Sequence, residues 1–320
     1  MKPITIDIHR WIAQAEDYQG IVQALGFESE LDRVRAVLGN WIDNADQEMR
    51  DALCWQFMDR SKYFRPLTVF TCYRALNDGR IPDQIVLSAA VVEMFHNMSL
   101  IVDDILDRSR YRRGKQTLHC RFGNLTALMA SGYIVADGYR LLIDDPEAIE
   151  LCSELMKRLG VAECLQWRLR QTPLGVEDWR RIASEDTGSM FEVCACLGAR
   201  GEKLRRFGHL LGVLYHGCDD VADVRGLEGL GGGGNDDIRD GILTLPAAIS
   251  IRDPKVAAMF RNPTKDNQLA MAGAFKRNLP EAESYLDQIA DEAKAEARLF
   301  AQNIAQLDTL VEHTRGLTKH

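Results

Sequence analysis

The feature that most constrains the fold of this chain is a long apolar stretch that runs directly into acidic residues. Residues 85–102 are mostly apolar, and Asp103, Asp104 and Asp107 follow them. On a helix these carboxylates lie on one side of about one turn. Because like charges so close together repel, a buried helix end carries them only if cations sit among them. Carboxylate oxygens suit Mg2+, so the stretch predicts a core helix that ends in a metal–diphosphate site.

The same acidic spacing returns later in the chain. Asp219, Asp220 and Asp223 follow another mostly apolar stretch, residues 207–218. Apolar approaches of this kind are typical of core helices rather than of solvated helix ends. If the two acidic clusters face each other, we expect them to form a clamp for metal ions and a diphosphate.

Basic residues lie on both sides of the first acidic cluster. Lys62 and Arg65 stand beside Pro66, which predicts the first turn of a helix. Two cations at a helix start oppose the helix dipole, so a bound anion explains them, although solvated loop charges fit the same pattern. Arg112 and Arg113 follow the acids and suit phosphate oxygens in fork geometry.

Composition and periodicity set the fold class. Apolar residues mostly recur at three and four positions and strand-like alternation is scarce, so the chain is predicted to be all-α. At 320 residues and 46% hydrophobic, with no linker and no repeat, we expect a single domain over residues 1–320. The net charge of -8 argues against a partner with a phosphate backbone, so no nucleic acid is expected.

Compartment and membrane topology follow from a few further features. The eight cysteines lie mostly within apolar helical patterns, and the start of the sequence lacks a basic and then apolar leader, so we expect a cytoplasmic protein with reduced core cysteines. Residues 85–102 are long enough to raise the question of a membrane span. Glu93, His96 and Asn97 interrupt them, so no transmembrane segment is expected.

Local signals predict several boundaries. Ser29 and the acidic residues around it predict a helix start, and Asp145 before Pro146 predicts a turn and cap rather than a metal site. A further helix is expected over residues 125–142. The glycine-rich residues 226–234 are interpreted as a lid over a reactive intermediate, with a plain linker as the alternative.

Together these stretches resemble the trans-isoprenyl diphosphate synthases, the polyprenyl synthetase family that includes farnesyl and geranylgeranyl diphosphate synthases. The resemblance covers roughly residues 57–249. Its motifs occur in family order: Lys62-x-x-Arg65-Pro66, Glu93-x-x-His96-x-x-Ser-Leu-Ile-x-Asp103-Asp104-x-x-Asp107, Arg112-Arg113-Gly-x-x-Thr117, Asp219-Asp220-x-x-Asp223 and Gly241-x-x-Thr244-Leu-Pro.

This resemblance implies the isoprenoid synthase fold, a bundle of about ten or more helices around a central cavity. It implies a transferase that condenses an allylic prenyl diphosphate with isopentenyl diphosphate, with up to three Mg2+ ions as cofactor. A homodimer is expected from the family habit and from the abundance of apolar helix surface. By resemblance, Asp103, Asp107 and Asp219 are metal ligands, and Asp104, Asp220 and Asp223 complete the catalytic clusters.

The resemblance also assigns substrate contacts. Arg112 would bind the allylic diphosphate, with Thr187 and His216 as further substrate-binding positions, while Lys62, Arg65, His96 and Arg113 would bind isopentenyl diphosphate. Taken alone, a histidine such as His96 is more often a core residue, but its spacing of seven from Asp103 puts the two on one helix face and favours a ligand role.

Three positions depart from the family pattern. Asp186 stands where the family usually has Lys, Ile242 where it has a second Lys, and His216 where it has Gln. Two cations for the allylic diphosphate are therefore absent. One close ion pair is worth about 4 kcal/mol at an effective dielectric of about 20, so we expect weakened allylic binding unless Arg225, Arg239 or another pose compensates.

These departures keep two other functions open: a terpene cyclase that ionises one prenyl diphosphate, and a non-catalytic subunit that pairs with an active synthase. If the protein is the prenyl-elongating transferase, helix geometry predicts the length of its product. A chain growing from Asp103 runs back along its helix past Ser99 and Met98, with Phe95 as the expected floor and a product of around fifteen to twenty carbons. Phe95 and Met98 also fit ordinary core positions.

Overall fold

The computed structural model describes residues 19–57, 61–226 and 234–319 of the chain. The chain forms two compact units, and each is described by itself. The first comprises the residues up to Cys152 together with Leu197–Arg200, and the second comprises Ser153–Cys196 and the residues from Gly201 on. The prediction of a single domain stays a prediction.

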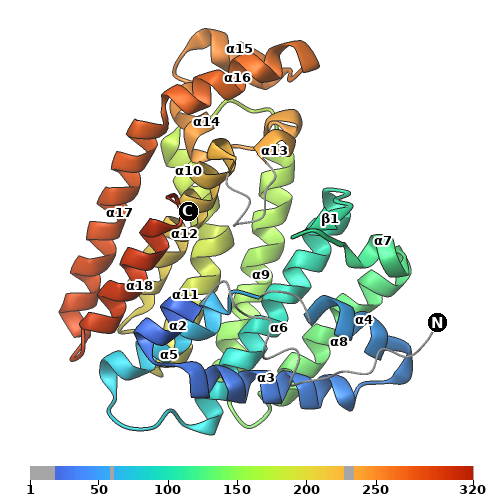
Figure 1. Cartoon of the computed structure of the whole chain (residues 1–320), viewed down its shortest axis with the longest axis vertical. Helices are drawn as coiled ribbons and strands as arrows, with labels where there is room; N and C mark the ends of the chain where they lie inside the picture. Colours follow the sequence, from blue (N-terminus) through green and yellow to red (C-terminus); the bar gives the residue numbers. More distant parts are fainter. Residues whose placement is uncertain (1–18, 58–60, 227–233, 320) are drawn as a thin grey trace. The chain divides into compact units, whose positions relative to one another are not determined.

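The first unit is helical apart from one small hairpin (Figure 1). Its elements include the start of the long helix α9. They are α2 (Gln19–Leu25), α3 (Glu28–Asp43), α4 (Gln47–Phe57), α5 (Phe64–Leu76), α6 (Asp83–Leu106), β1 (Tyr111–Arg112), β2 (Lys115–Gln116), α7 (Leu118–Phe122), α8 (Asn124–Leu141) and α9 (Pro146–Leu169). The all-α class predicted from the sequence is confirmed.

Helix α6 is the core of the first unit. It packs against α3, α5 and α8. By length and composition it is apolar enough to cross a membrane, with a mean hydropathy of 1.8 over its most apolar window, but 67% of that window is buried inside the protein. Such burial is what a core helix shows.

The hairpin after α6 turns at two residues. Tyr111 pairs with Gln116 and Arg112 pairs with Lys115, which leaves Arg113 and Gly114 as the turn. Both turn residues have positive φ, 53° and 78°. A two-residue hairpin turn of this hand suits the twist of its strands, but the left-handed conformation is unfavourable for a residue with a side chain, such as Arg113.

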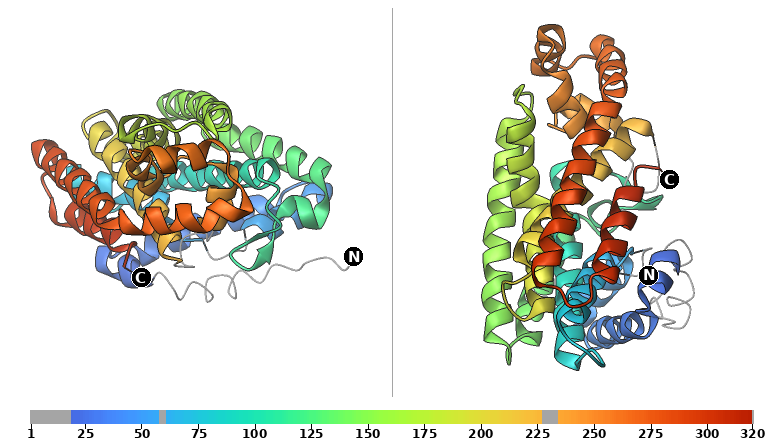
Figure 2. Two further views of the ribbon diagram at one scale, coloured as in Figure 1. Left: turned by 90° about the horizontal axis from the view of Figure 1, so that it is seen from above. Right: turned by 90° about the vertical axis from the view of Figure 1, so that its left-hand side faces the viewer.

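The second unit is built around helix α12. This helix packs against α10, η2, α14, α17 and α18, and α17 and α18 lie side by side in both views of Figure 2. The remaining elements of the unit are α10 (Val176–Ala183), the π-helical turn η2 (Ser184–Gly188), α11 (Ser189–Ala199), α12 (Arg205–Arg225), α13 (Gly234–Asp240), α14 (Leu245–Ser250), α15 (Pro254–Arg261), α16 (Lys265–Arg277), α17 (Leu279–Phe300) and α18 (Ala305–Gly316).

The π turn η2 interrupts what is otherwise one continuous helix through α10 and α11. Glycine at position 212 lets α12 approach this turn closely. A Cβ atom at Gly212 would lie 2.6 Å from the carbonyl oxygen of Thr187, which is far inside van der Waals contact. The close approach of η2 and α12 therefore depends on this glycine.

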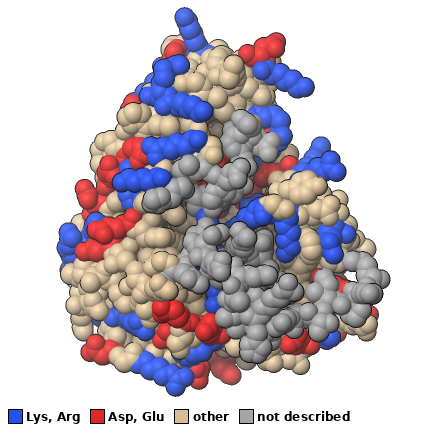
Figure 3. All heavy atoms as spheres, in the orientation of Figure 1, with Lys and Arg blue, Asp and Glu red and all other residues tan. Residues whose placement is uncertain are grey.

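Charges of both signs are distributed over the face seen in Figure 3. Lysine and arginine gather over α15 and α16, where Lys255, Lys265 and Arg277 are exposed. Elsewhere on this face acidic and basic side chains alternate. Most of the predicted lid, residues 227–233, lies outside the described residues.

Candidate active site

The three aspartates at the end of α6 do not share one environment. Asp103 and Asp107 lie one helical turn apart and are partly exposed, whereas Asp104 is buried. Arg112 Nε of the hairpin donates to Asp104 Oδ1 at 2.9 Å. Burial raises the pKa of Asp104 even though the Arg112 guanidinium opposes that shift. Asp104 thus braces the hairpin against α6, and the motif turns two carboxylates, rather than three, away from the core.

Basic groups lie around His96, about two turns before Asp103 on α6. Burial lowers the pKa of His96 well below its usual range, and the charges of Arg65, Arg113 and Arg112 lower it further. The imidazole is therefore neutral among three guanidiniums. Its Nδ1 is buried and has no hydrogen-bond partner within the described ranges. The structure thus brings together His96 and the arginines that the sequence singled out.

A buried carboxyl lies among these arginines. Glu93 is 2% exposed, and Ser61 Oγ donates to its Oε1 at 2.5 Å. Burial raises the pKa of Glu93, while Arg65 and Arg113 oppose the shift. Lys62 is buried as well, directly before α5, and Arg65 lies in the first turn of that helix. The first turn of α5 itself holds no acidic residue, and a bound anion there would be favoured by the helix dipole.

The residues predicted to set product length lie on the same helix. Phe95 is fully buried, and its ring centroid lies 5.3 Å from that of Tyr139 in α8. A Cβ atom at Gly138 would lie 2.5 Å from Phe95 Cε1, so the ring fills a recess made by this glycine. Met98 and Ser99 are partly exposed, and Ser99 Oγ donates to the His96 carbonyl at 2.9 Å.

In the second acidic motif, as in the first, the middle aspartate makes structural hydrogen bonds. Asp219 and Asp223 lie one turn apart on α12. Asp220 Oδ2 accepts two hydrogen bonds of 2.8 Å, from Trp179 Nε1 in α10 and from the backbone N–H of Leu245 at the start of α14. Asp220 therefore holds three helices together. Trp179 gave no signal in the sequence, because its partner lies 41 residues away.

Three predicted positions meet where η2 contacts α12. Thr187 Oγ1 lies 3.0 Å from His216 Nδ1, and Asp186 Oδ2 lies 3.4 Å from the same nitrogen. Burial lowers the pKa of His216, but Asp220 and Asp186 outweigh it and raise that pKa to about 9. Asp186 and His216, two of the positions that depart from the family pattern, are thus in contact with each other.

Ile242 is the third position that departs from the family pattern, and Arg225 and Arg239 are the arginines that could replace the missing lysines. All three lie elsewhere in the second unit. Ile242 is partly exposed beside α14. Arg225 Nη2 pairs with Glu283 Oε1 at 2.5 Å, and Arg239 Nε pairs with Asp240 Oδ1 at 2.7 Å. Both guanidiniums pair with carboxylates, and compensation for the missing lysines stays a prediction.

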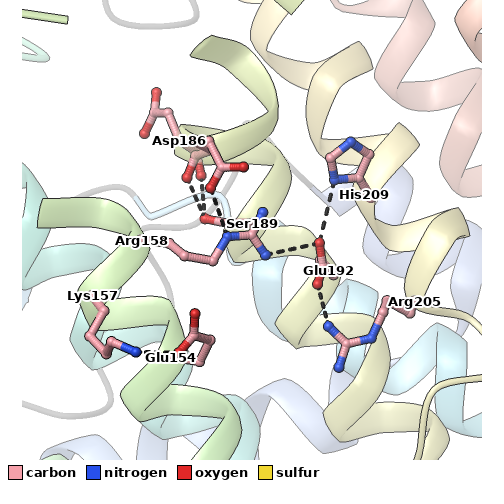
Figure 4. Close-up of polar contacts among 9 residues, drawn as sticks. Glu154, Lys157, Arg158, Asp186, Ser189, Glu192, Arg205 and His209 are labelled. Carbon is pink, nitrogen blue, oxygen red and sulfur yellow. Dashed lines mark hydrogen bonds and ion pairs between the residues drawn. The ribbon is translucent and has the colours of Figure 1, made fainter. Parts of the chain in front are cut away.

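A buried ion network supports η2 from beneath. Glu192 in α11 accepts from Arg158 Nη1 at 3.1 Å, pairs with Arg205, and lies 3.4 Å from His209 Nδ1 (Figure 4). Arg158 Nε also donates to Glu185 Oε2 of η2 at 2.9 Å. Burial raises the pKa of Glu192, but its basic neighbours outweigh burial and hold that pKa at about 2. Periodicity alone could not reveal this network, which joins α9, α11 and α12.

The described residues include no cluster of three or more His, Cys, Asp or Glu side chains that could hold a metal by themselves. The bracing of Asp104 and Asp220 explains this, because each motif then offers two carboxylates. Two carboxylates suit Mg2+, which usually keeps several waters and takes its remaining ligands from substrate phosphates. The donor sets therefore fit the predicted cofactor. The prediction that the two motifs face each other stays a prediction.

Comparison with known proteins identifies the family. The family described as polyprenyl synthetase matches residues 46–276. The chain belongs to this family. It is 27% identical over 306 residues to nonaprenyl diphosphate synthase of Mycobacterium tuberculosis, covering 89% of this chain and 90% of the relative. It is also 27% identical to octaprenyl diphosphate synthase of Escherichia coli, over 68% of this chain and 72% of that one.

Solved structures of polyprenyl synthases share the fold. A polyprenyl synthase from Caulobacter crescentus, complexed with calcium and isoprenyl diphosphate, superposes with a TM-score of 0.84 at 23% identity and covers 96% of this chain and 99% of that chain. Heptaprenyl diphosphate synthase from Staphylococcus aureus gives a TM-score of 0.83 at 20% identity, over 92% of this chain and 98% of that one. The predicted isoprenoid synthase fold is confirmed, and the family assignment makes this polyprenyl synthetase an enzyme of the transferase class.

Proposed function

We propose that this polyprenyl synthetase condenses an allylic prenyl diphosphate with isopentenyl diphosphate in an Mg2+-dependent reaction. The observation that carries the proposal is the group of guanidiniums around the neutral imidazole of His96: Arg65, Arg112 and Arg113. Glu93 and Asp104 lie among these guanidiniums and offset part of their charge. Diphosphate oxygens match the fork geometry of arginine, so a cluster of this kind suits a diphosphate.

Asp103 and Asp107 on α6, and Asp219 and Asp223 on α12, are the residues that would hold Mg2+. When bound, the metal would stabilise the charge that develops on the leaving pyrophosphate. Asp104 acts indirectly, because its hydrogen bond fixes Arg112 beside the aspartates of α6. Asp220 acts in the same way, by fixing α12 against α10 and the start of α14.

Lys62, Arg65, His96 and Arg113 would bind isopentenyl diphosphate. The neutral imidazole of His96 offers a hydrogen bond through its buried Nδ1, and the surrounding cations supply charge. The left-handed backbone of Arg113 fits this role, because strained conformations of this kind cluster at ligand sites and are stabilised by their surroundings. These four groups have no purpose in an enzyme that uses one diphosphate only, which favours elongation over cyclisation and over a non-catalytic role.

Product length would be set along α6, with Phe95 as the floor. Its ring is fully buried and fixed against Gly138 and Tyr139, so a growing prenyl chain meets a rigid barrier there. Met98 and Ser99 lie about one turn closer to Asp103 and are partly exposed. A medium product of around fifteen to twenty carbons follows from this spacing. The two relatives named above are a nonaprenyl and an octaprenyl diphosphate synthase, so their products are longer than this.

Helix α8 offers a surface for a homodimer. Its outer face carries an apolar stripe at helical spacing, in which Leu125, Leu128 and Met129 are 75%, 49% and 52% exposed. The stripe continues through Gly132 and Ala136, both exposed. A second copy of this chain is the proposed occupant, because exposed apolar stripes of this length mark protein interfaces. Six of the eight cysteines are buried, which suits a cytoplasmic location.

One assay separates the three functions. The pure protein is incubated with Mg2+ and allylic diphosphates of several lengths, with and without labelled isopentenyl diphosphate. Labelled prenyl diphosphate supports elongation, unlabelled hydrocarbon or alcohol indicates cyclisation, and turnover only with an added synthase indicates a partner subunit. Asp103→Asn and Asp219→Asn should each lower turnover by orders of magnitude with the fold intact, whereas activity that persists in EDTA would exclude the metal-dependent mechanism.

A further inference from the structure

His216 is held from one edge of its ring by the π turn. Its Nδ1 contacts Thr187 Oγ1 at 3.0 Å and Asp186 Oδ2 at 3.4 Å. Thr187 Oγ1 also donates to Asp186 Oδ2 at 3.4 Å, which closes a small network of hydrogen bonds. Because a carboxylate only accepts and the threonine proton is directed to it, Nδ1 must carry the proton that it shares with these two oxygens.

The backbone is shaped to make this contact. The π turn inserts a residue into the helix, so Asp186 and Thr187 project toward α12. Gly212, one turn before His216, removes the Cβ atom that would otherwise collide with the Thr187 carbonyl at 2.6 Å. Two separate features, a π turn and a glycine, therefore bring the imidazole to the carboxylate.

The opposite edge of the ring faces the second acidic motif. His216 Nε2 lies 4.0 Å from Asp220 Oδ1, which is too long for a direct hydrogen bond. The other oxygen of Asp220 is occupied by Trp179 and Leu245, so Asp220 cannot turn toward the ring without losing those bonds. Nε2 is thus the ring nitrogen that can meet a ligand next to the motif.

We propose that Asp186 is a positioning residue, which acts through Nδ1 of His216 to direct Nε2 of that ring at the diphosphate bound beside Asp219 and Asp223. The proposal rests on the proposed function, because it assigns the allylic diphosphate as the ligand. It gives the acid at position 186 a purpose in substrate binding. Without Asp186 the ring keeps only Thr187 as a partner on that edge and rotates more freely.

The test is a double-mutant cycle of Asp186→Ala and His216→Ala. Asp186→Ala alone should raise KM for the allylic diphosphate about tenfold, as expected for a lost hydrogen bond to a charged group. It should leave KM for isopentenyl diphosphate unchanged, and it should have little further effect in the His216→Ala background. Asp291→Ala is the matched control, because it removes an exposed carboxylate of α17 in the same unit. Effects that multiply in the double variant would overturn the proposal.

A second measurement does not depend on turnover. The ring nitrogens of His216 are observed by 1H–15N NMR of the 15N-histidine-labelled protein, with and without Mg2+ and inorganic pyrophosphate. A hydrogen-bonded Nδ1–H signal should be present in the wild type and should shift upfield in Asp186→Ala, where only Thr187 remains as a partner, and the Nε2 signal should shift when pyrophosphate binds. An unchanged Nδ1–H in the variant would refute the positioning role. If the wild-type enzyme forms no prenyl diphosphate, the proposed function fails instead, and the NMR result still decides the role of Asp186.

Discussion

Replacement of the buried carboxylate in the ion network beneath η2 should reveal its energetic weight. In Glu192→Gln the side chain keeps its size but loses its charge, so Arg158 and Arg205 each lose a charged partner. Neighbouring basic groups hold the pKa of Glu192 at about 2, against an ordinary value of 4.5. At 1.36 kcal/mol per pKa unit this corresponds to about 3 kcal/mol of folding free energy. The side chain is only 9% exposed, so screening by solvent removes little of it.

The stability difference between wild type and Glu192→Gln should depend on pH in a defined direction. A carboxylate with a lowered pKa in the folded protein stabilises the fold fully above pH 4.5, and this stabilisation is lost as the pH falls from 4.5 toward 2. Urea unfolding, followed by circular dichroism and tryptophan fluorescence at pH 7 and at steps down to pH 3, measures the difference between wild type and Glu192→Gln. That difference should be about 3 kcal/mol at pH 7 and should shrink below pH 4.5.

Glu154→Gln is the matched control. Glu154 lies in α9 near the network and pairs with Lys157 at 2.8 Å, but it is exposed (Figure 4). Its replacement should leave the free energy of unfolding nearly unchanged at every pH. A difference between wild type and Glu192→Gln that stays constant from pH 7 to pH 3 would show that packing, and not charge, accounts for the loss, and the electrostatic reasoning would be refuted.

Three further changes test other contacts. Gly138→Ala should cost about 1–3 kcal/mol of stability, because the new methyl group overlaps the Phe95 ring, and Phe95→Leu should relieve that cost in thermal melts. Trp179→Phe keeps an aromatic side chain, although a smaller one, and removes the hydrogen bond to Asp220, so turnover should fall and stability should drop by about 1.5–3 kcal/mol, while equal kcat in both proteins would show that Asp220 needs no such support. Phe95→Ala should lengthen the product and Met98→Phe should shorten it, as read by mass spectrometry; unchanged lengths in both variants would place the floor elsewhere.

Hydrophobic periodicity predicted the helices well where one face is buried. The helix expected over residues 125–142 is α8 (Asn124–Leu141), and Asp145 caps α9 by accepting from the Ala148 N–H at 3.2 Å. The predicted start at Ser29 was wrong, because α3 begins at Glu28. The residue at its N-cap is Phe27, whose fully buried ring packs 5.6 Å from that of Phe70. Tertiary packing set this boundary instead of the capping chemistry of Ser29.

Contacts between distant elements account for what the sequence could not predict. The two acidic motifs and the basic residues were recognisable by type and spacing, and the structure gathers Arg65, Arg112 and Arg113 around His96. The sequence did not reveal that Asp104 and Asp220 serve as braces, because their partners are chosen by the fold. Nor does the sequence reveal the π turn, because Ser, Asp, Thr and Gly in residues 184–188 fit a cap, a turn or a loop as well as a π turn.

The π turn has a consequence for how this site can change. It is a helix that contains one residue more than the α-helical path requires, so removal of a single residue from Ser184–Gly188 would restore an unbroken α-helix while α10 and α11 keep their own packing. Only the residues within the turn would change position, by about 100° around the helix axis, which is the angle that one residue occupies. Elsewhere in a buried helix, a one-residue deletion disrupts the packing of the core. Here it would change the site alone, because it would turn Asp186 and Thr187 away from His216. Natural insertions and deletions at this turn therefore offer a way to alter diphosphate recognition without rebuilding the core.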